Sequence, residues 1–208
     1  MHRGGILGLL EFQSKLKGCR YCRDVLGLKF EPKPLVWGRE GARIVVIGQA
    51  PSMSAGLCGR PFSKDLETPD ASGRRLIEWL GVQERTFFDP DIFYITGVAH
   101  CYPGKGKGGD LPPPRVCAEM WLGEELSYLS PRLFVILGRY AASWAFPKRK
   151  FEDLVFEELE FRGRTAIVLP HPSPANRGWF KAHPEFAGRL TVLRGLISRA
   201  LTDSVLCT

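Results

Sequence analysis

Four short apolar runs constrain most strongly how this chain of 208 residues can fold. Each run is rich in β-branched or other apolar side chains and ends near a glycine or a proline, as buried strands of a parallel sheet do. The runs are residues 43–47, 93–96, 133–137 and 165–169. Because helical patterns lie between them, we expect a three-layer α/β/α fold with a central, mostly parallel, four-stranded sheet.

Three further segments carry apolar side chains at helical spacing, which predicts helices packed on the sheet. They are residues 72–80, 116–129 and 184–201. Ser72 is the expected N-cap of the first, because its hydroxyl can accept a hydrogen bond from a free amide of the first turn. The glycine- and lysine-rich residues 103–114 are expected to form a surface loop. We find no dividing linker, so residues 1–208 are expected to form a single domain.

The chain is basic, with a formal net charge of +7 and a pI near 9.2. This balance favours a polyanionic partner, since each phosphate that is neutralised releases a condensed counterion. We find no signal peptide, and no stretch long and apolar enough for a transmembrane helix. We therefore expect no membrane partner and a protein that works in the cytoplasm or at the nucleoid.

Six cysteines are present, and without a sign of secretion a metal site is favoured over disulfides. Cys19 and Cys22 form a C-x-x-C, and Cys101 with Cys117 forms a second, wider pair. Zinc and an iron–sulfur cluster both accept four cysteine ligands, and the spacing alone does not choose between them. A redox C-x-x-C is the alternative, but it leaves the second pair unused. The other two cysteines have no assigned role: Cys58 and Cys207.

The loops that follow the predicted strands carry unusual segments. In open α/β sheets, ligands bind at the carboxyl ends of the strands. Gly-Gln-Ala-Pro-Ser occupies 48–52 and His-Pro-Ser-Pro-Ala-Asn-Arg occupies 171–177, after the first and last predicted strands. Gly-Arg-Pro-Phe at 59–62 and Asp-Ala-Ser-Gly at 70–73 lie between them. Each segment alone is a weak signal, but their order and their position on these loops are specific.

In this order the segments resemble the uracil-DNA glycosylase superfamily, and the resemblance extends from Cys19 to the final helix. Within the superfamily the chain is most similar to the iron–sulfur type-B, or family 5, enzymes. That similarity rests on 59–62, 70–73, 171–174 and Gly-Arg-Leu-Thr at 188–191. The resemblance implies a [4Fe–4S] cluster held by four cysteines: Cys19, Cys22, Cys101 and Cys117.

Two positions depart from other branches of that superfamily. Ala50 stands where the single-uracil enzymes carry an aspartate that handles the water, and Gly97 stands where family 4 enzymes carry an asparagine that reads uracil. Both departures fit the type-B branch, which accepts more kinds of damaged base. The spacer 63–69 is longer than is usual in the family, so Asp65 and Asp70 are both candidates for the catalytic acid.

The expected function is therefore DNA base-excision repair. The enzyme would flip uracil, and by resemblance hypoxanthine, xanthine or ethenocytosine, out of DNA and hydrolyse the N-glycosidic bond to leave an abasic site. Three alternatives stay open: a non-catalytic, metal-stapled DNA-binding module, a stricter family 4-like enzyme, and a redox protein. The expected partners are double- or single-stranded DNA and a sliding clamp, and the expected state is a monomer.

Four roles in the base pocket follow. Phe62 is the expected stacking platform for the extruded base, because an aromatic face binds any base. The backbone of Gly48, Gln49 and Ala50 would contact the base edge. His171 would stabilise the negative charge on the departing base, and Asp70 would stabilise the cation-like sugar and orient water.

The DNA contacts are expected along the last loop. Ser173 suits a phosphate, and Asn176 or Arg177 would fill the gap left by the flipped base. Arg60 is expected to hold the DNA backbone. Basic residues elsewhere would do the same: Lys105, Lys107 and Lys181.

Overall fold

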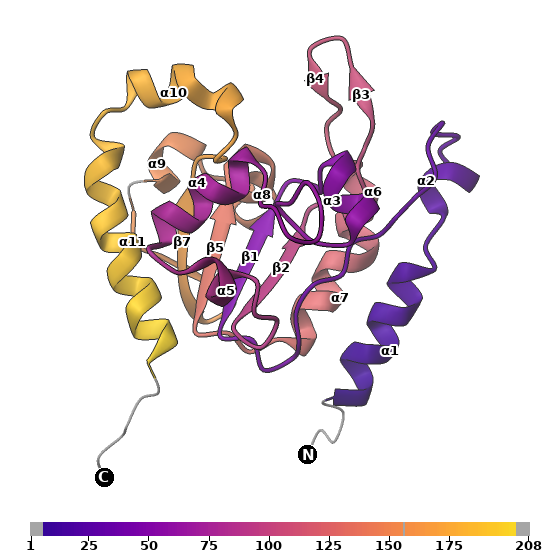
Figure 1. Ribbon diagram of the computed structural model, residues 1–208, viewed down its shortest axis with the longest axis horizontal. Coiled ribbons are helices and arrows are strands. Elements are labelled where there is room, and N and C mark those ends of the chain that lie inside the picture. The colour runs from indigo at the N-terminus through magenta and orange to yellow at the C-terminus, as the bar shows by residue number, and fades with distance from the viewer. Residues whose placement is uncertain (1–5, 156, 203–208) are drawn as a thin grey trace.

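The computed structural model describes residues 6–155 and 157–202, so Cys207 lies outside the described residues. Its centre is a five-stranded sheet in the order β2-β1-β5-β7-β6 (Figure 1). The strands are β1 (Ile44–Gly48), β2 (Phe93–Gly97), β5 (Leu133–Leu137), β6 (Leu159–Phe161) and β7 (Arg164–Leu169). The first three and β7 are mutually parallel, which confirms the predicted α/β fold and its mostly parallel sheet.

The fifth strand is a difference from the four expected. β6 pairs antiparallel with β7 and lies at the edge of the sheet. The two strands are joined by Arg162 and Gly163, whose φ angles are 53° and 72°. Positive φ at both central residues is the signature of the tight turn that suits a twisted hairpin. A strand of three partly exposed residues carries no continuous apolar run, so the sequence pattern missed it.

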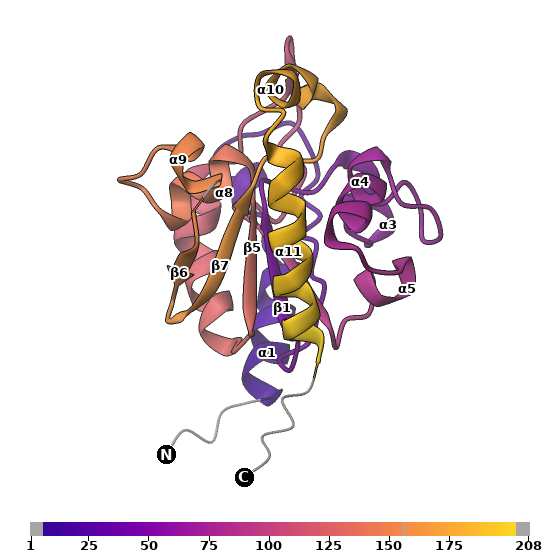
Figure 2. The same cartoon turned by 90° about the vertical axis from the view of Figure 1, so that its left-hand side faces the viewer.

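The chain order alternates these strands with helices, as predicted. The helices are α1 (Ile6–Lys17), α2 (Tyr21–Asp24), α3 (Met53–Cys58), α4 (Ala71–Leu80), α5 (Glu84–Phe87), α6 (Arg115–Cys117), α7 (Gly123–Glu125), α8 (Gly138–Ala145), α9 (Phe151–Val155), α10 (Arg177–Ala182) and α11 (Phe186–Leu201). Viewed along the sheet edge, α4 and α11 cover one face and α8 the other (Figure 2). This gives the three expected layers.

Two predicted helices differ in detail. The helix expected at 72–80 begins at Ala71, and its N-cap is Asp70, whose Oδ1 accepts from Gly73 N at 2.8 Å. The segment expected as one helix over 116–129 is a chain of short pieces that includes a π-helical turn, Ala118–Leu122. That segment packs on α1, where the Phe12 ring lies 5.8 Å from that of Trp121.

The core lies on both sides of β1 and β5, all of whose residues are buried. Their carboxyl ends meet at one edge of the sheet, since Gly48 lies beside Gly97 and Leu137 beside Leu169. Residues 103–114, expected as a loop, contain a short hairpin of β3 (Lys105–Gly106) and β4 (Gly109–Asp110). This hairpin and α10 both project beyond that edge (Figures 1 and 2).

In the described part of the chain, no helix has both the length and the apolar character that are needed to cross a bilayer.

Candidate active site and cysteine cluster

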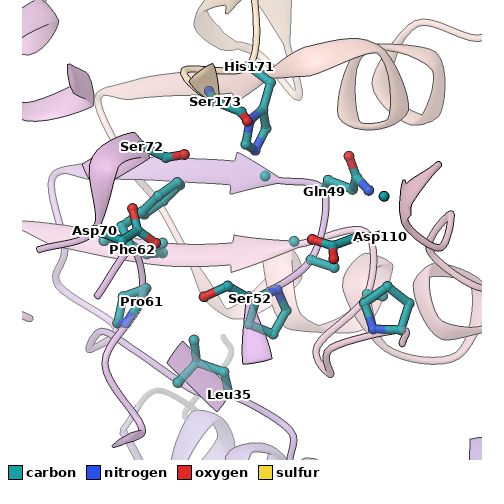
Figure 3. A pocket seen from close by; sticks show the side chains of 18 of the residues that line it. Leu35, Gln49, Ser52, Pro61, Phe62, Asp70, Ser72, Asp110, His171 and Ser173 are labelled. Carbon is teal, nitrogen blue, oxygen red and sulfur yellow. Dashed lines mark hydrogen bonds between the residues drawn. The ribbon is translucent and has the colours of Figure 1, made fainter. Parts of the chain in front are cut away.

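A cavity of about 370 Å³ opens at the carboxyl ends of the strands, the edge where open α/β sheets bind ligands. Six parts of the chain contribute to its wall: Leu35, the loops after β1, β2 and β7, the segment from Pro61 to Ser72, and the β3–β4 hairpin. Figure 3 shows His171 pointing into the cavity, with Phe62 and Asp70 on another side. The sequence-predicted base-pocket residues Gly48, Gln49 and Ala50 line it too.

His171 enters the cavity as a neutral hydrogen-bond donor. Ser173 N donates to its Nδ1 at 3.2 Å, so the ring hydrogen of the neutral form lies on Nε2. Burial lowers the pKa of His171 below its usual value, and the charge of Asp70 offsets this only in part. The sequence left the charge state open, and this environment favours the neutral ring.

A glycine makes room for His171. Gly138, the first residue of α8, has a φ of +79°, and a Cβ added there would lie 3.1 Å from the His171 Cβ. Both the backbone conformation and the close approach therefore favour glycine.

Asp70 is half-buried on the cavity wall, where one carboxylate oxygen caps α4. Its second oxygen takes no part in that cap bond to Gly73. Asp65, the other acid candidate, is exposed, and its Oδ1 accepts from Glu67 N at 2.9 Å and Thr68 N at 2.7 Å. These bonds lower the pKa of Asp65 and make it a turn-forming residue. Of the two acids, only Asp70 lines the cavity.

Phe62 has an unusual backbone conformation, with a φ of 53°. Its ring lines the cavity and packs against Phe87, with ring centroids 6.1 Å apart. Gly73 passes so close that a Cβ there would lie 2.4 Å from the Phe62 carbonyl oxygen. The glycine of the 70–73 segment therefore permits the close approach that places Phe62.

Backbone forms the floor of the cavity beside β2. Val98 N donates to Gly48 O and Ala99 N to Gln49 O, both at 3.0 Å. A Cβ on Gly97 would meet Ala99 O at 3.1 Å and Gln49 at 3.3 Å. A side chain at Gly97 therefore requires its neighbours to move, which accounts physically for the glycine at this position.

The loop after His171 is held by its own side chains. Asn176 Nδ2 donates to His171 O at 2.8 Å, and Ser173 Oγ accepts from Ala175 N at 3.2 Å. Asn176 is thus committed to shaping the loop. Arg177, the first residue of α10, is exposed, so of the two predicted gap-filling residues it is the one free to reach outward.

Arg60 is not where a phosphate contact requires it. Its side chain is only 10% exposed, its NH2 group donates to Glu84 Oε1 at 3.1 Å, and its guanidinium carbon lies 3.5 Å from the Phe88 ring centroid. In this structure Arg60 is buried in an ion pair and a cation–π contact, which does not favour the predicted contact with the DNA backbone, and that contact stays a prediction.

The four predicted ligand cysteines lie close enough to affect one another. Burial, followed by the neighbouring thiols of Cys117, Cys22 and Cys19, raises the pKa of Cys101 to about 12. Burial, Cys117 and Cys19 likewise raise the pKa of Cys22. Within residues 6–155 and 157–202, no three His, Cys, Asp or Glu side chains are grouped closely enough to hold one metal ion. A set of four thiols is the donor chemistry of both Cys₄ zinc and iron–sulfur sites.

Cys58 is separate from this set. It lies at the end of α3, where its thiol contacts Ala55 O and Arg60 O at 3.7 Å.

A buried polar network beside the cysteines was missed by sequence reasoning. His100 Nε2 lies 2.9 Å from Glu125 Oε2, and both side chains are 1% exposed. Burial disfavours the charged ring, but Glu125 and Cys117 outweigh that cost and keep the pKa of His100 above its usual value. The position of His100 beside Cys101 was the available signal. Glu125 gave none, because it reaches His100 only through the fold.

Asp110 is a second missed residue. It lies on the hairpin in the low-complexity segment, lines the cavity (Figure 3), and accepts from Tyr102 OH at 2.9 Å.

Fold and site together define an α/β protein with an acid–imidazole pocket at the carboxyl edge of its sheet. A profile of the Uracil DNA glycosylase superfamily matches residues 36–192, and the chain belongs to that superfamily. It is 27% identical over 224 residues to the type-5 uracil-DNA glycosylase of Pyrobaculum aerophilum, covering 93% of this chain and 92% of that protein. It is 32% identical over 135 residues to the type-4 uracil-DNA glycosylase of Archaeoglobus fulgidus, covering 64% of this chain and 60% of that protein. The predicted family resemblance is confirmed.

Proposed function

We propose that this protein is a monofunctional uracil-DNA glycosylase that extrudes uracil from DNA and hydrolyses its N-glycosidic bond. The observation that carries the proposal is the placement of a neutral His171 donor and the Asp70 carboxylate on the wall of one cavity. The superfamily membership and the names of the two relatives support the same reaction.

In the proposed reaction, the extruded base stacks on Phe62, and its edge meets the backbone of Gly48, Gln49 and Ala50. The bond between the base and C1′ breaks, and its electron pair leaves with the base. His171 Nε2–H stabilises that developing charge on a base oxygen, as a preorganised donor does in an oxyanion hole.

The sugar side of the reaction is assigned to Asp70. Its carboxylate stabilises the cation-like sugar and orients a water molecule, which forms the new bond to C1′. Asp70 accepts the proton that the water loses, and the departed base anion takes a proton from solvent. Ala50 leaves the first loop without an acid, and the cavity is lined by two carboxylates, Asp70 and Asp110. The role is assigned to Asp70, which lies beside Phe62 (Figure 3), whereas Asp110 lies on the hairpin and accepts from Tyr102 OH.

The substrate range is proposed to extend beyond uracil to hypoxanthine, xanthine and ethenocytosine. A cavity of about 370 Å³ is within the range of sites that hold ligands larger than one pyrimidine. The absence of a side chain at Gly97 also leaves the base edge without a residue that would read uracil alone.

We further propose that Cys19, Cys22, Cys101 and Cys117 hold a [4Fe–4S] cluster. Four cysteine thiols are the donor set of such a cluster, and these four lie near enough to influence one another. The resemblance to the iron–sulfur type-B enzymes, rather than the geometry, favours the cluster over zinc. When bound, the cluster supplies a staple that joins the N-terminal segment to the loop after β2. Its effect on glycosidic cleavage is therefore indirect, through the position of that loop.

The proposed DNA contacts lie on the projecting elements around the cavity. Ser173 and the exposed Arg177 contact the strand that holds the flipped base, and Arg177 fills the gap while Asn176 shapes the loop. Three lysines reach the DNA backbone: Lys105, Lys107 and Lys181. We propose a monomer that works on DNA in the cytoplasm or nucleoid, with a sliding clamp as its recruiting partner.

The test is base release from a labelled duplex with one uracil opposite guanine, read as strand breaks after alkali. Asp70→Asn is the sharper variant, because asparagine still caps a helix but carries no charge. Asp65→Asn is its matched control, and His171→Ala removes the donor. Large losses for Asp70→Asn and His171→Ala with normal release by Asp65→Asn would support the roles. A wild-type protein that binds the duplex but releases no uracil, hypoxanthine or ethenocytosine would leave only the DNA-binding module.

A further inference from the structure

The buried pair His100 and Glu125 has no part in the proposed hydrolysis. It lies between β2, the loop that leads to Cys101, and the helical segment from Arg115 to Glu125, which contains Cys117. Glu125 accepts from three donors: Tyr94 OH at 2.8 Å, Thr96 Oγ1 at 2.7 Å, and His100 Nε2 at 2.9 Å. A buried carboxylate with this many donors is fully committed, and it holds the His100 ring in one orientation.

The other side of the His100 residue faces a cysteine. His100 N donates to Cys117 Sγ at 3.4 Å, and the ring Nδ1 lies 3.5 Å from the same sulfur. The Glu125 carboxylate therefore lies on one side of the ring and the Cys117 sulfur on the other. With that sulfur as the thiolate that a cluster ligand would be, a ring protonated at both nitrogens donates to both groups.

The network also reaches α1, the helix that precedes the N-terminal cysteines. Gln13 Nε2 donates to Tyr94 OH at 3.3 Å and to Gly38 O at 3.1 Å. Gln13 belongs to α1, which ends two residues before Cys19. The same chain of hydrogen bonds therefore connects the elements that present Cys19, Cys101 and Cys117.

We propose that His100 is a positioning residue for Cys117, donating to its sulfur from the backbone amide and the ring, and that Glu125 fixes the ring for this purpose. The inference rests on the proposed iron–sulfur cluster. Partners of metal ligands orient them and tune the metal, and hydrogen bonds to cluster sulfurs help to set the reduction potential. Thr96 and His100 also line the cavity, so these two residues lie between the proposed cluster and the proposed base pocket.

The test compares His100→Leu with His100→Asn in the whole protein purified with its cluster. Leucine removes both ring hydrogen bonds, whereas asparagine keeps an N–H donor near the position of Nδ1. We expect His100→Leu to lose iron to a chelator about 10- to 100-fold faster than wild type, the usual effect of removing such a partner. We expect His100→Asn to stay near the wild-type rate.

The reduction potential provides a readout that a purely structural role would not move. A donor to the sulfur stabilises the more negative, reduced cluster, so its loss lowers the potential. Each tenfold loss in that stabilisation corresponds to about 59 mV for a one-electron couple. His100→Leu should therefore shift the potential downward, and His100→Asn should restore most of it.

Glu125→Gln provides a second measurement if His100→Leu does not fold. It puts an amide N–H₂ where an oxygen accepted, so the ring is no longer held in one orientation. Iron loss should again be faster and the reduction potential lower than in the wild type, but by less than in His100→Leu. Its control is Glu124→Gln, because Glu124 is an exposed neighbour whose carboxylate accepts from Tyr128 OH, a residue outside the network.

Wild-type iron release and potential in both His100 variants and in Glu125→Gln would overturn the proposal. Wild-type protein purified without iron or sulfide would overturn it together with the cluster, while the uracil-release assay would still judge the glycosylase.

Discussion

Replacing Gly138 with alanine tests how tightly the fold positions His171. Gly138 has a φ of +79°, and a Cβ there would lie 3.1 Å from the His171 Cβ. The left-handed conformation costs a residue with a Cβ about 1–2 kcal/mol. The contact adds a second effect, because His171 or α8 must then move by a few tenths of an ångström.

The two effects appear in different measurements. The strain lowers the free energy of unfolding by about 1–2 kcal/mol, which urea denaturation detects. The shift of His171 lowers kcat for uracil release by about tenfold, since a misplacement of about 1 Å costs on the order of 100-fold. KM should change little, because Phe62 and the pocket backbone stay in place.

Gly163→Ala is the matched control. Its φ is +72°, and nothing lies within 4 Å of an added Cβ. It should lose a similar free energy of unfolding and keep full activity. Equal activity in the Gly138 and Gly163 variants would refute the argument that the glycine at 138 makes room for the catalytic histidine.

Three further predictions follow from the site. Because burial lowers the pKa of His171, the unfolded state binds more protons than the folded state between the lowered pKa and about 6.5, so stability rises with pH across that interval. For the same reason kcat/KM should stay at its neutral-histidine level to below pH 6.5. A kcat/KM that falls at the ordinary histidine pKa would contradict the burial argument. Asp70→Ala should destabilise the protein by about 1 kcal/mol through the lost cap, whereas Asp70→Asn should not, as measured by urea denaturation; equal losses in both variants would count against the capping role. Arg177→Ala should reduce the slope of log K for DNA binding against log salt concentration by about 0.9, as measured by titrations at several salt concentrations. Arg60→Lys should leave that slope unchanged while lowering stability, because the Arg60 side chain is buried. A changed slope for Arg60→Lys would place Arg60 at the DNA interface.

The four long parallel strands could be predicted because β1, β2 and β5 are buried throughout and β7 is buried over its last four residues, which forces continuous apolar runs. β6 could not be predicted, since its three residues are only partly buried. The cap of α4 was misassigned by two positions because Asp70 and Ser72 are both good capping residues, and only the backbone geometry decides between them.

The site was predictable where it lies on loops that directly follow strands. Asp70, Phe62 and His171 all line the cavity, as their loop positions indicated. The burial of Arg60 could not be predicted, because nothing local reveals that Phe88 and Glu84 enclose it. The pairing of His100 with Glu125 spans 25 residues, so it is created by packing rather than by any sequence pattern.

The π-helical turn over Ala118–Leu122 has a consequence for the side chains on either side of it. In a regular α-helix, eight residues turn the side-chain direction by about 800°, so Cys117 and Glu125 would point about 80° apart. A π turn absorbs one extra residue, and seven effective steps leave the two within about 20° of each other. The added residue therefore changes the side-chain direction so that a thiol and a carboxylate about two turns apart face the same imidazole.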